Sequence, residues 1–359
     1  RAVLGRFVIM TVILGLMIIA LQLPIRSLAF SLLEGGVTVE SLAMEYFDIR
    51  IWGAPATLLT FSLMGLLVGL GNSKQLLIVQ LFLNGLNISL DIYFAGILNL
   101  GVAGIALGTV IAEWITVCFA FLLIVMELKK RKTPEEAFWS RSGILDRQKL
   151  LRTVSANADI MIRTLLLVFS FAFFTNQSAR FGDVVLAANH ILLQFVTFAA
   201  FFLDAYAFVV EALVGSAIGA KRQDLFDVAV KKSTILAAIT ALFLAAAVWI
   251  LGGMLINLLT DLEDVRGRAS GMLYLAAIYI FFSFAAFQLD GIFIGASSTK
   301  QMRNAAVLSL SVYLIAWWLL IDRFGVTGLW WAMIIYVAAR ADALLIYYPK
   351  LRASVGIES

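Results

Sequence analysis

Residues 102–132 read VAGIALGTVIAEWITVCFAFLLIVMELKKRK. Up to position 126 the stretch holds a single charged residue, Glu113, and basic residues fill positions 129–132. A helix that spans a bilayer needs about 20 mostly apolar residues, and basic residues gather where such a helix meets the cytoplasm. The stretch therefore predicts a membrane-spanning helix that ends on the cytoplasmic side.

The composition of the whole chain is that of a membrane protein. Of its 359 residues 62% are hydrophobic and 14% are charged, and the mean hydropathy is +0.98; soluble domains carry about 45–50% apolar and about 25% charged residues. The single cysteine, Cys118, excludes a disulfide within the chain, and the single histidine, His190, excludes a histidine-rich metal site. We therefore expect no metal, no other cofactor and no nucleic-acid partner.

Read with a window of spanning length, the sequence predicts about ten transmembrane helices and hence an all-α polytopic membrane fold. The predicted spans are 7–30, 44–70, 76–98, 102–127, 151–175, 187–214, 233–256, 270–296, 304–321 and 326–348.

Charged residues predict the orientation of these spans. Between the fourth and fifth spans lie Lys129, Lys130, Arg131, Lys132, Arg141, Arg147, Lys149 and Arg152. The loops on the opposite side carry acids instead, at Glu34, Glu40, Asp261, Glu263 and Asp264. Because basic loops stay in the cytoplasm, we expect both ends of this chain to be cytoplasmic and the protein to be a multi-pass component of the plasma (inner) membrane.

An internal repeat relates the two halves. GLLVG at 65–69, followed by SKQ at 73–75, matches GIFIG at 291–295, followed by TKQ at 299–301. GVAG at 101–104 likewise matches GVTG at 325–328. We therefore predict two parallel lobes, residues 1–140 with four spans and a cytoplasmic linker, and residues 141–359 with six spans. Since two spans of the second lobe lack counterparts in the first, we expect a natural protein with twelve helices that begins about 75 residues earlier.

Several motifs carry a resemblance to a known family. They are GLLVGLGNSKQ at 65–75, NGLNISLD at 84–91, ANHI at 188–191, EALVG at 211–215 and LDGIFIG at 289–295. In combination they resemble the DinF-like branch of the MATE (multidrug and toxic compound extrusion) transporters. The resemblance implies a two-lobed exporter of organic cations and other xenobiotics, with a V-shaped central cavity, that takes up protons or sodium in exchange. It also implies a proton site whose acidic residue lies on a first helix that has no counterpart in this chain.

Asp91 is the strongest candidate for a coupling residue, because a charge at bilayer depth costs about 2.5–3.5 kcal/mol and calls for a partner or a role. Asn87 lies four residues earlier on the same helical face, and Thr109 lies on the following helix. The resemblance implies that these residue types at this spacing form the polar cavity of the first lobe. We therefore predict a proton or cation coupling site at Asp91, Asn87 and Thr109; the alternative is a carboxylate that Asn87 holds for helix packing alone.

The second half has its own acidic candidates. Asp204 and Glu211 are seven residues apart on one span and hence lie roughly on one face. Asp290 lies near the cytoplasmic end of its span and is a further cation-site candidate. For Glu211 and Asp290, an ion pair at a gate or interface is the alternative. Asp159 and Arg163, at positions i and i+4, predict an intrahelical ion pair.

Three residues are weaker candidates for a substrate cavity. Glu113 lies near mid-membrane and either faces the cavity or accepts from Arg340. His190 could titrate near neutral pH, although a polar cap at the membrane interface is the alternative. Phe198 belongs to a cluster of phenylalanines that could bind flat or cationic compounds by stacking and cation–π attraction.

The sequence favours an ion-driven antiporter over other classes. It contains neither a Cys–His pair suited to catalysis nor a phosphate-binding loop with its lysine, so we expect a monomeric transporter in the lipid bilayer and no enzyme. A flippase of lipid-linked precursors on a related scaffold is the alternative. Such a protein should line its cavity with several cations, whereas the deep cations here are chiefly Arg163 and Arg340.

Overall fold

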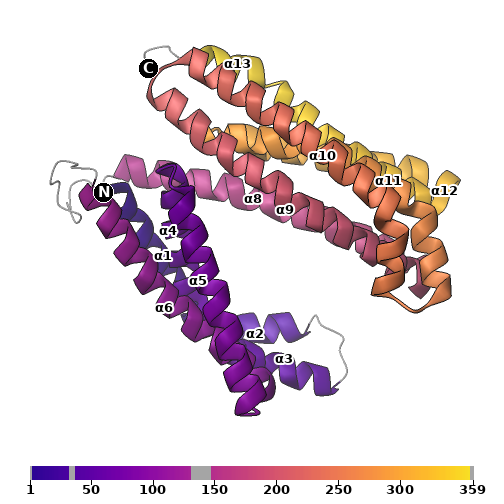
Figure 1. Ribbon diagram of the computed structural model, residues 1–359, viewed down its shortest axis with the longest axis horizontal. Helices are drawn as coiled ribbons and strands as arrows, with labels where there is room; N and C mark the ends of the chain where they lie inside the picture. Colours follow the sequence, from indigo (N-terminus) through magenta and orange to yellow (C-terminus); the bar gives the residue numbers. More distant parts are fainter. Residues whose placement is uncertain (1, 32–36, 131–146, 356–359) are drawn as a thin grey trace. The chain divides into compact units, whose positions relative to one another are not determined.

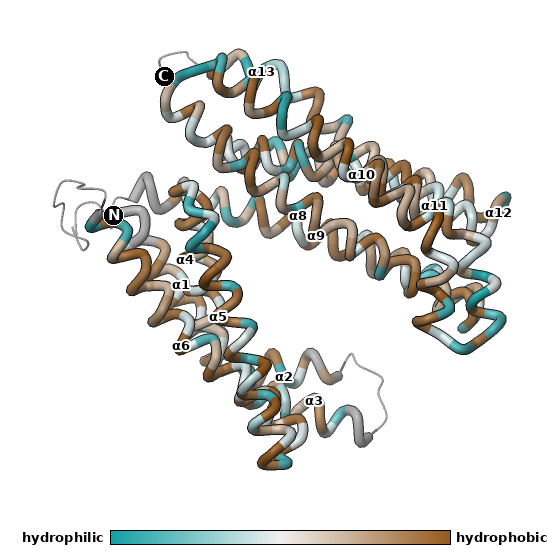
Figure 2. The backbone as a smooth tube through the Cα atoms, in the orientation of Figure 1, coloured by the Kyte–Doolittle hydropathy of each residue, from teal (hydrophilic) through white to brown (hydrophobic). Residues whose placement is uncertain are grey.

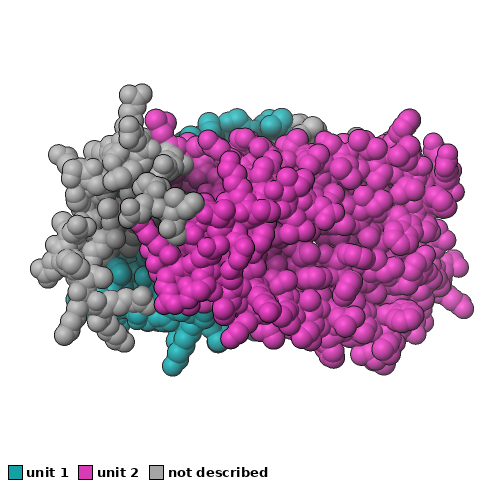
Figure 3. Space-filling view, turned by 90° about the horizontal axis from the view of Figure 1, so that it is seen from above, with its two compact units in different colours: residues 1–150 teal, residues 151–359 magenta. Residues whose placement is uncertain are grey.

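The computed structural model describes residues 2–31, 37–130 and 147–355, and every regular element within them is a helix (Figure 1). The chain forms two compact units, Arg1–Leu150 and Leu151–Ser359, which Figure 3 distinguishes by colour. The predicted lobe boundary at residue 140 and most of the predicted linker lie outside the described residues.

Unit 1 consists of one bent pair of helices followed by three spans, the first of which is interrupted by a short 3₁₀ helix. Its elements are α1 (Ala2–Ala20), α2 (Gln22–Ser31), α3 (Val37–Arg50), the short 3₁₀ helix η1 (Ile51–Gly53), α4 (Ala54–Gly69), α5 (Ser73–Asp91), the π-helix η2 (Ile92–Ile97) and α6 (Gly101–Lys130). The chain bends by 61° between Phe7–Ala20 and Gln22–Leu28. Pro55 lies in the first turn of α4, where its missing N–H costs no helical hydrogen bond, and η1 interrupts the predicted span 44–70 directly before it.

Unit 2 is built around one central helix. Its elements are α8 (Arg147–Ala179), α9 (Asp183–Gly219), α10 (Gln223–Leu259), α11 (Glu263–Gly295), α12 (Thr299–Leu345) and α13 (Tyr348–Ser354). Helix α11 packs against α9, α10 and α12 and is the most buried of the spans. Residues of these helices form one large hydrophobic core around Trp330, Tyr313 and Phe293.

The described residues contain eight helices that are long and apolar enough to cross a membrane, or nine if the bent pair in α1 and α2 is one span. Helix α12 is one of these eight helices. However, Gly325 within it has φ 54° and ψ −130°, which are not helical values. That break lies between the predicted spans 304–321 and 326–348. Hydrophobic residues prevail along the long helices in Figure 2, and hydrophilic residues gather at the turn between α10 and α11. The predicted all-α polytopic membrane fold is confirmed.

Matched positions of the repeat adopt the same backbone geometry. Gly71 has φ +68° and its counterpart Ser297 has φ +54°. Both donate their N–H to the carbonyl three residues earlier, and the next residue donates to the carbonyl five residues before it, as in a Schellman helix ending. Gly101 and its counterpart Gly325 also share a positive φ, +56° and +54°. The two halves thus share their backbone geometry at these matched positions.

Candidate functional site

The three residues predicted for the first half meet in unit 1. The Asn87 amide nitrogen donates to Asp91 Oδ1 at 3.3 Å and to Thr109 Oγ1 at 3.1 Å. Helix α5 supplies Asn87 and Asp91 one turn apart, and α6, which packs against α5, supplies Thr109. Among the described residues Asp91 has no ion-pair partner, so its carboxylate is held by neutral groups.

Two glycines of α6 allow this close approach. A Cβ atom added to Gly108 would lie 2.5 Å from Asp91 Oδ1 and 3.2 Å from the Asp91 nitrogen. One added to Gly104 would lie 2.8 Å from the backbone of Phe94 and Ala95, which belong to the π-helix η2. Such π-segments often occur at functional sites. Sequence reasoning missed Gly108, although the Gly-x-x-x-Gly spacing of Gly104 and Gly108 is a known signal for close helix contact in membranes.

Gly108→Ala is expected to displace the Asp91 carboxylate and weaken its hydrogen bond with Asn87. Because misplacing a functional group by about 1 Å can reduce turnover by about a hundredfold, we expect any activity that depends on Asp91 to fall by about 10- to 100-fold. The measurement is the initial rate of that activity at equal protein content. Gly85→Ala on α5, where an added Cβ meets open space, should be as active as the unmodified protein; an equal loss in both variants would contradict the placement of Gly108 against Asp91.

The Glu113 carboxylate is hydrogen-bonded to other side chains of unit 1. Its carboxylate accepts from Arg50 Nη1 at 2.8 Å and Nη2 at 2.5 Å, and Thr57 Oγ1 donates to it at 2.9 Å. The partners that the structure gives Glu113 are thus Arg50 and Thr57, whereas Arg340 donates to Asp290 within unit 2; a place of Glu113 in a substrate cavity stays a prediction. Glu113 is 7% exposed, and a buried, paired carboxylate of this kind joins α3 to α6.

Asp290 is the centre of a buried ionic cluster in unit 2. Its Oδ2 atom accepts from Arg340 Nη2 at 2.7 Å and also from Arg163 Nη2. The predicted pair of Asp159 with Arg163 is therefore wrong. Asp159 instead accepts from Arg303 Nη1 at 2.6 Å, because the long side chains on α8 and α12 reach across to neighbouring helices.

The second-half candidates line one cavity of ≈ 420 Å³ within unit 2. Helices α8, α9, α11 and α12 contribute its charged residues, which are Arg163, Asp204, Glu211, Asp290 and Arg340. In the part of the chain that the structure describes, Asp204 and Glu211 have neither a hydrogen-bond partner nor an ion-pair partner. The structure thus brings Asp204, Glu211 and Asp290 together, but only the first two carry unpaired carboxylates.

Two of the weaker candidates do not line this cavity. His190 is exposed on α9 and lies 3.3 Å from the Gln194 side chain. Phe198 is 57% exposed, and its ring stacks edge-on against Phe202. Both side chains are exposed on the surface of unit 2, and their place in a central substrate cavity stays a prediction.

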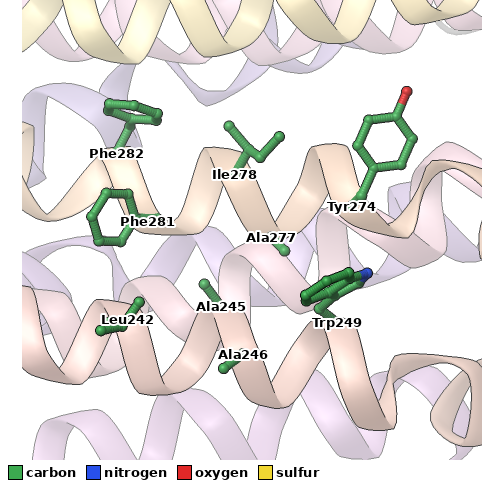
Figure 4. A pocket seen from close by; sticks show the side chains of 9 residues that line it. All are labelled: Leu242, Ala245, Ala246, Trp249, Tyr274, Ala277, Ile278, Phe281 and Phe282. Carbon is green, nitrogen blue, oxygen red and sulfur yellow. The ribbon is translucent and has the colours of Figure 1, made fainter.

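A second hollow, between α10 and α11, has a different character (Figure 4). It measures ≈ 450 Å³, and Trp249 and Tyr274 lie at one end of it and Phe281 and Phe282 at the other. Its remaining lining consists of Leu242, Ala245, Ala246, Ala277 and Ile278. Because no lining residue is charged, this hollow offers contact to apolar groups and is not a candidate for ion coupling.

Long apolar helices that hold ionisable groups inside each unit define a polytopic α-helical membrane protein. The sequence model of the MatE family matches residues 1–93 and 160–319. The DNA damage-inducible protein F of Escherichia coli is 33% identical over 340 residues, which are 92% of this chain and 71% of that protein. The chain therefore belongs to the MatE family, and the resemblance to MATE transporters of the DinF type is confirmed.

The chain is also similar to more distant proteins. The multidrug export protein MepA of Staphylococcus aureus is 22% identical over 349 residues, which are 95% of this chain and 75% of that protein. The crystal structure of the Vibrio cholerae MATE transporter VcmN in the bent form has a TM-score of 0.85 at 20% identity. It covers 98% of this chain and 79% of the other.

Proposed function

We propose that the protein is a secondary active exporter that moves small organic compounds, cations among them, out of the cell in exchange for protons. Asp91, hydrogen-bonded by Asn87 beside Thr109, is the proposed coupling site. Asp204 and Glu211 are the proposed second-lobe carboxylates. The two lobes would expose the substrate alternately to the two sides of the membrane, as transporters built from repeats do.

One observation carries the assignment of the coupling residues. Each buried carboxylate that an arginine neutralises, such as Glu113 or Asp290, would leave an unpaired guanidinium if it took up a proton. Asp91, Asp204 and Glu211 have no such partner among the described residues. They can therefore gain and lose a proton without breaking an ion pair, and Asp290 is better suited to hold its two arginines in place.

Protons are the favoured coupling ion. The Asn87 side chain directs its amide nitrogen, a donor, toward both Asp91 and Thr109. Sodium would instead require several oxygen atoms directed at one point.

Asp91→Asn is expected to abolish proton-driven export while the protein stays folded, because asparagine keeps the size and hydrogen bonds of the side chain but cannot carry the proton. The full-length protein is reconstituted in vesicles, and movement of an ethidium-type dye is followed under an imposed pH gradient. A sodium gradient is tested in parallel. Asp183→Asn, at the exposed start of α9, is the matched control and should transport normally.

Other outcomes redirect the assignment. Transport that needs sodium and survives in Asp91→Asn would move coupling to Asp204 and Glu211. Dye movement in neither gradient would contradict the export of such compounds and make transport of lipid-linked precursors the next activity to assay.

A further inference from the structure

The two arginines of the unit 2 cavity have unused hydrogen-bonding capacity. Each donates through one terminal nitrogen to the same oxygen atom of Asp290, whereas a guanidinium carries five N–H donors. Their side chains are only 17% and 12% exposed for Arg163 and Arg340. Apart from the Tyr336 ring, whose centroid lies 5.9 Å from the Arg340 guanidinium, the described residues give them no further hydrogen-bond or ion-pair partner. Buried donors of this kind are suited to an acceptor that enters from the cavity.

The charge of the cavity depends on how many protons it holds. From α8, α11 and α12, Arg163, Asp290 and Arg340 together contribute one net positive charge. Helix α9 faces them with Asp204 and Glu211, whose carboxylates are unpaired among the described residues. The cavity therefore has a net charge of about −1 when both acids are ionised and about +1 when both are protonated. Tyr279 of α11 also lines it and is neutral in either state.

We propose that the protonated form of this cavity binds an organic anion, a carboxylate or sulfonate on an aromatic body, through Arg163 and Arg340. The proposal deepens the proposed function, since it rests on the cavity being part of the transport path and names a substrate class for it. Asp290 is a positioning residue here, because it holds both guanidinium groups at the cavity wall.

The lining fits both parts of such a ligand. Planar guanidinium groups bind carboxylate and sulfonate oxygens through parallel hydrogen bonds, and the hydroxyl group of Thr164 supplies one further donor. Phe171, Phe208 and Phe287 provide apolar surface for a ring. The volume of ≈ 420 Å³ lies within the range of small-molecule sites, about 300–1,000 Å³. Electrostatic interactions are strong in a site of low dielectric. A change of the cavity charge from about −1 to about +1 therefore makes the cavity attract anions instead of cations.

Equilibrium dialysis with two matched probes tests the proposal. The full-length protein is placed in nanodiscs of zwitterionic phospholipid, and binding of 2-naphthoate and of 2-naphthylmethylammonium is measured at about pH 5 and about pH 8. We expect naphthoate to bind at least tenfold more tightly at the lower pH, which corresponds to about 1.4 kcal/mol. The ammonium probe should show the opposite trend.

Variants then assign the effect to the named residues. Asp204→Asn combined with Glu211→Gln mimics the protonated cavity and should bind naphthoate tightly at both pH values. Arg163→Gln should weaken naphthoate binding at least tenfold, and Arg163→Lys, which keeps the charge but loses the planar fork, should recover part of it. Arg268→Gln, at an exposed position of α11, is the matched control and should leave binding unchanged.

Naphthoate binding that is equal at both pH values and unaltered in the Asp204→Asn, Glu211→Gln variant would overturn the proposal. Dialysis needs no ion gradient, so its result is separate from the export assay. Loss of proton-driven export with anion binding retained would contradict the proposed function alone, and normal export without anion binding would contradict this inference alone.

Discussion

Gly291→Ala and Gly295→Ala are each expected to destabilise unit 2 strongly. A Cβ atom on Gly291 would lie 2.4 Å from the backbone oxygen of Ala207, and one on Gly295 would lie 2.4 Å from the backbone oxygen of Glu211. Backbone atoms cannot rotate away as a side chain can, so α11 and α9 would have to separate. Overpacking of a tight core costs about 1–3 kcal/mol and occasionally more, and we expect the upper part of that range for each substitution.

The measurement is the apparent melting temperature of detergent-purified protein, read from the loss of its monodisperse peak in size-exclusion chromatography. Gly267→Ala and Gly271→Ala on the same helix are the matched controls, because an added Cβ meets open space at both positions. Alanine favours a helix over glycine by about 0.8–1.0 kcal/mol, so the controls should melt at the same or a slightly higher temperature. An equal decrease in melting temperature in all four alanine variants would show that the stability of α11 does not depend on its close contact with α9.

These glycines also connect stability to the proposed site. Gly291 lines the cavity itself, and Glu211, whose backbone faces Gly295, supplies one of its unpaired carboxylates. A surviving fraction of either alanine variant should therefore transport poorly as well as melt early. The repeat motif at 291–295 thus has a packing role that its glycine pattern alone could only suggest.

The spans were predictable because each is set by its own residues. A run such as 102–126, with one charge, has a low free energy only as a helix inside the lipid bilayer. The break just before α4 also has a local cause. Pro55 has no N–H to donate to the Ile51 carbonyl, and its ring crowds that carbonyl. The chain there forms the 3₁₀ turn Ile51–Gly53, in which the Ala54 N–H donates to Ile51 instead.

The site in the first half was largely predictable because its residues lie close together in the sequence. Asn87 and Asp91 are one helical turn apart, and a short connection brings Thr109 of the next helix close to them. Gly108 escaped notice because glycines are frequent in membrane helices, and only the three-dimensional contact with Asp91 distinguishes it from the others. The coupling role of the three residues stays a prediction.

Long-range ion pairs could not be predicted from spacing. Glu113 pairs with Arg50, 63 positions away, and Arg163 pairs with Asp290, 127 positions away. The i, i+4 rule favoured Asp159 as the partner of Arg163, but such a surface-type pair contributes only about 0.2–0.5 kcal/mol. A buried guanidinium without a carboxylate costs several times more, so tertiary packing decides the pairing.

Asp290→Asn is accordingly expected to cost about 3–5 kcal/mol of stability, because it removes the negative charge that neutralises two buried guanidinium groups. The apparent melting temperature should fall by several degrees in the same chromatographic assay. Asp224→Asn is the matched control. It removes the acid of the exposed pair with Arg222, and water solvates both groups there, so its melting temperature should stay unchanged.

Combined substitutions separate charge from packing. Asp290→Asn together with Arg340→Gln removes one positive charge along with the negative one, and should recover part of the loss. Asp204 is a candidate substitute acceptor, since its carboxylate lines the same cavity as Arg163 and Arg340. If it takes over one arginine in the single variant, Asp204→Asn combined with Asp290→Asn should melt well below either single variant. Small and additive changes in melting temperature in all these variants would mean that both arginines are hydrated in the membrane. That result would contradict the burial of this ionic cluster in unit 2.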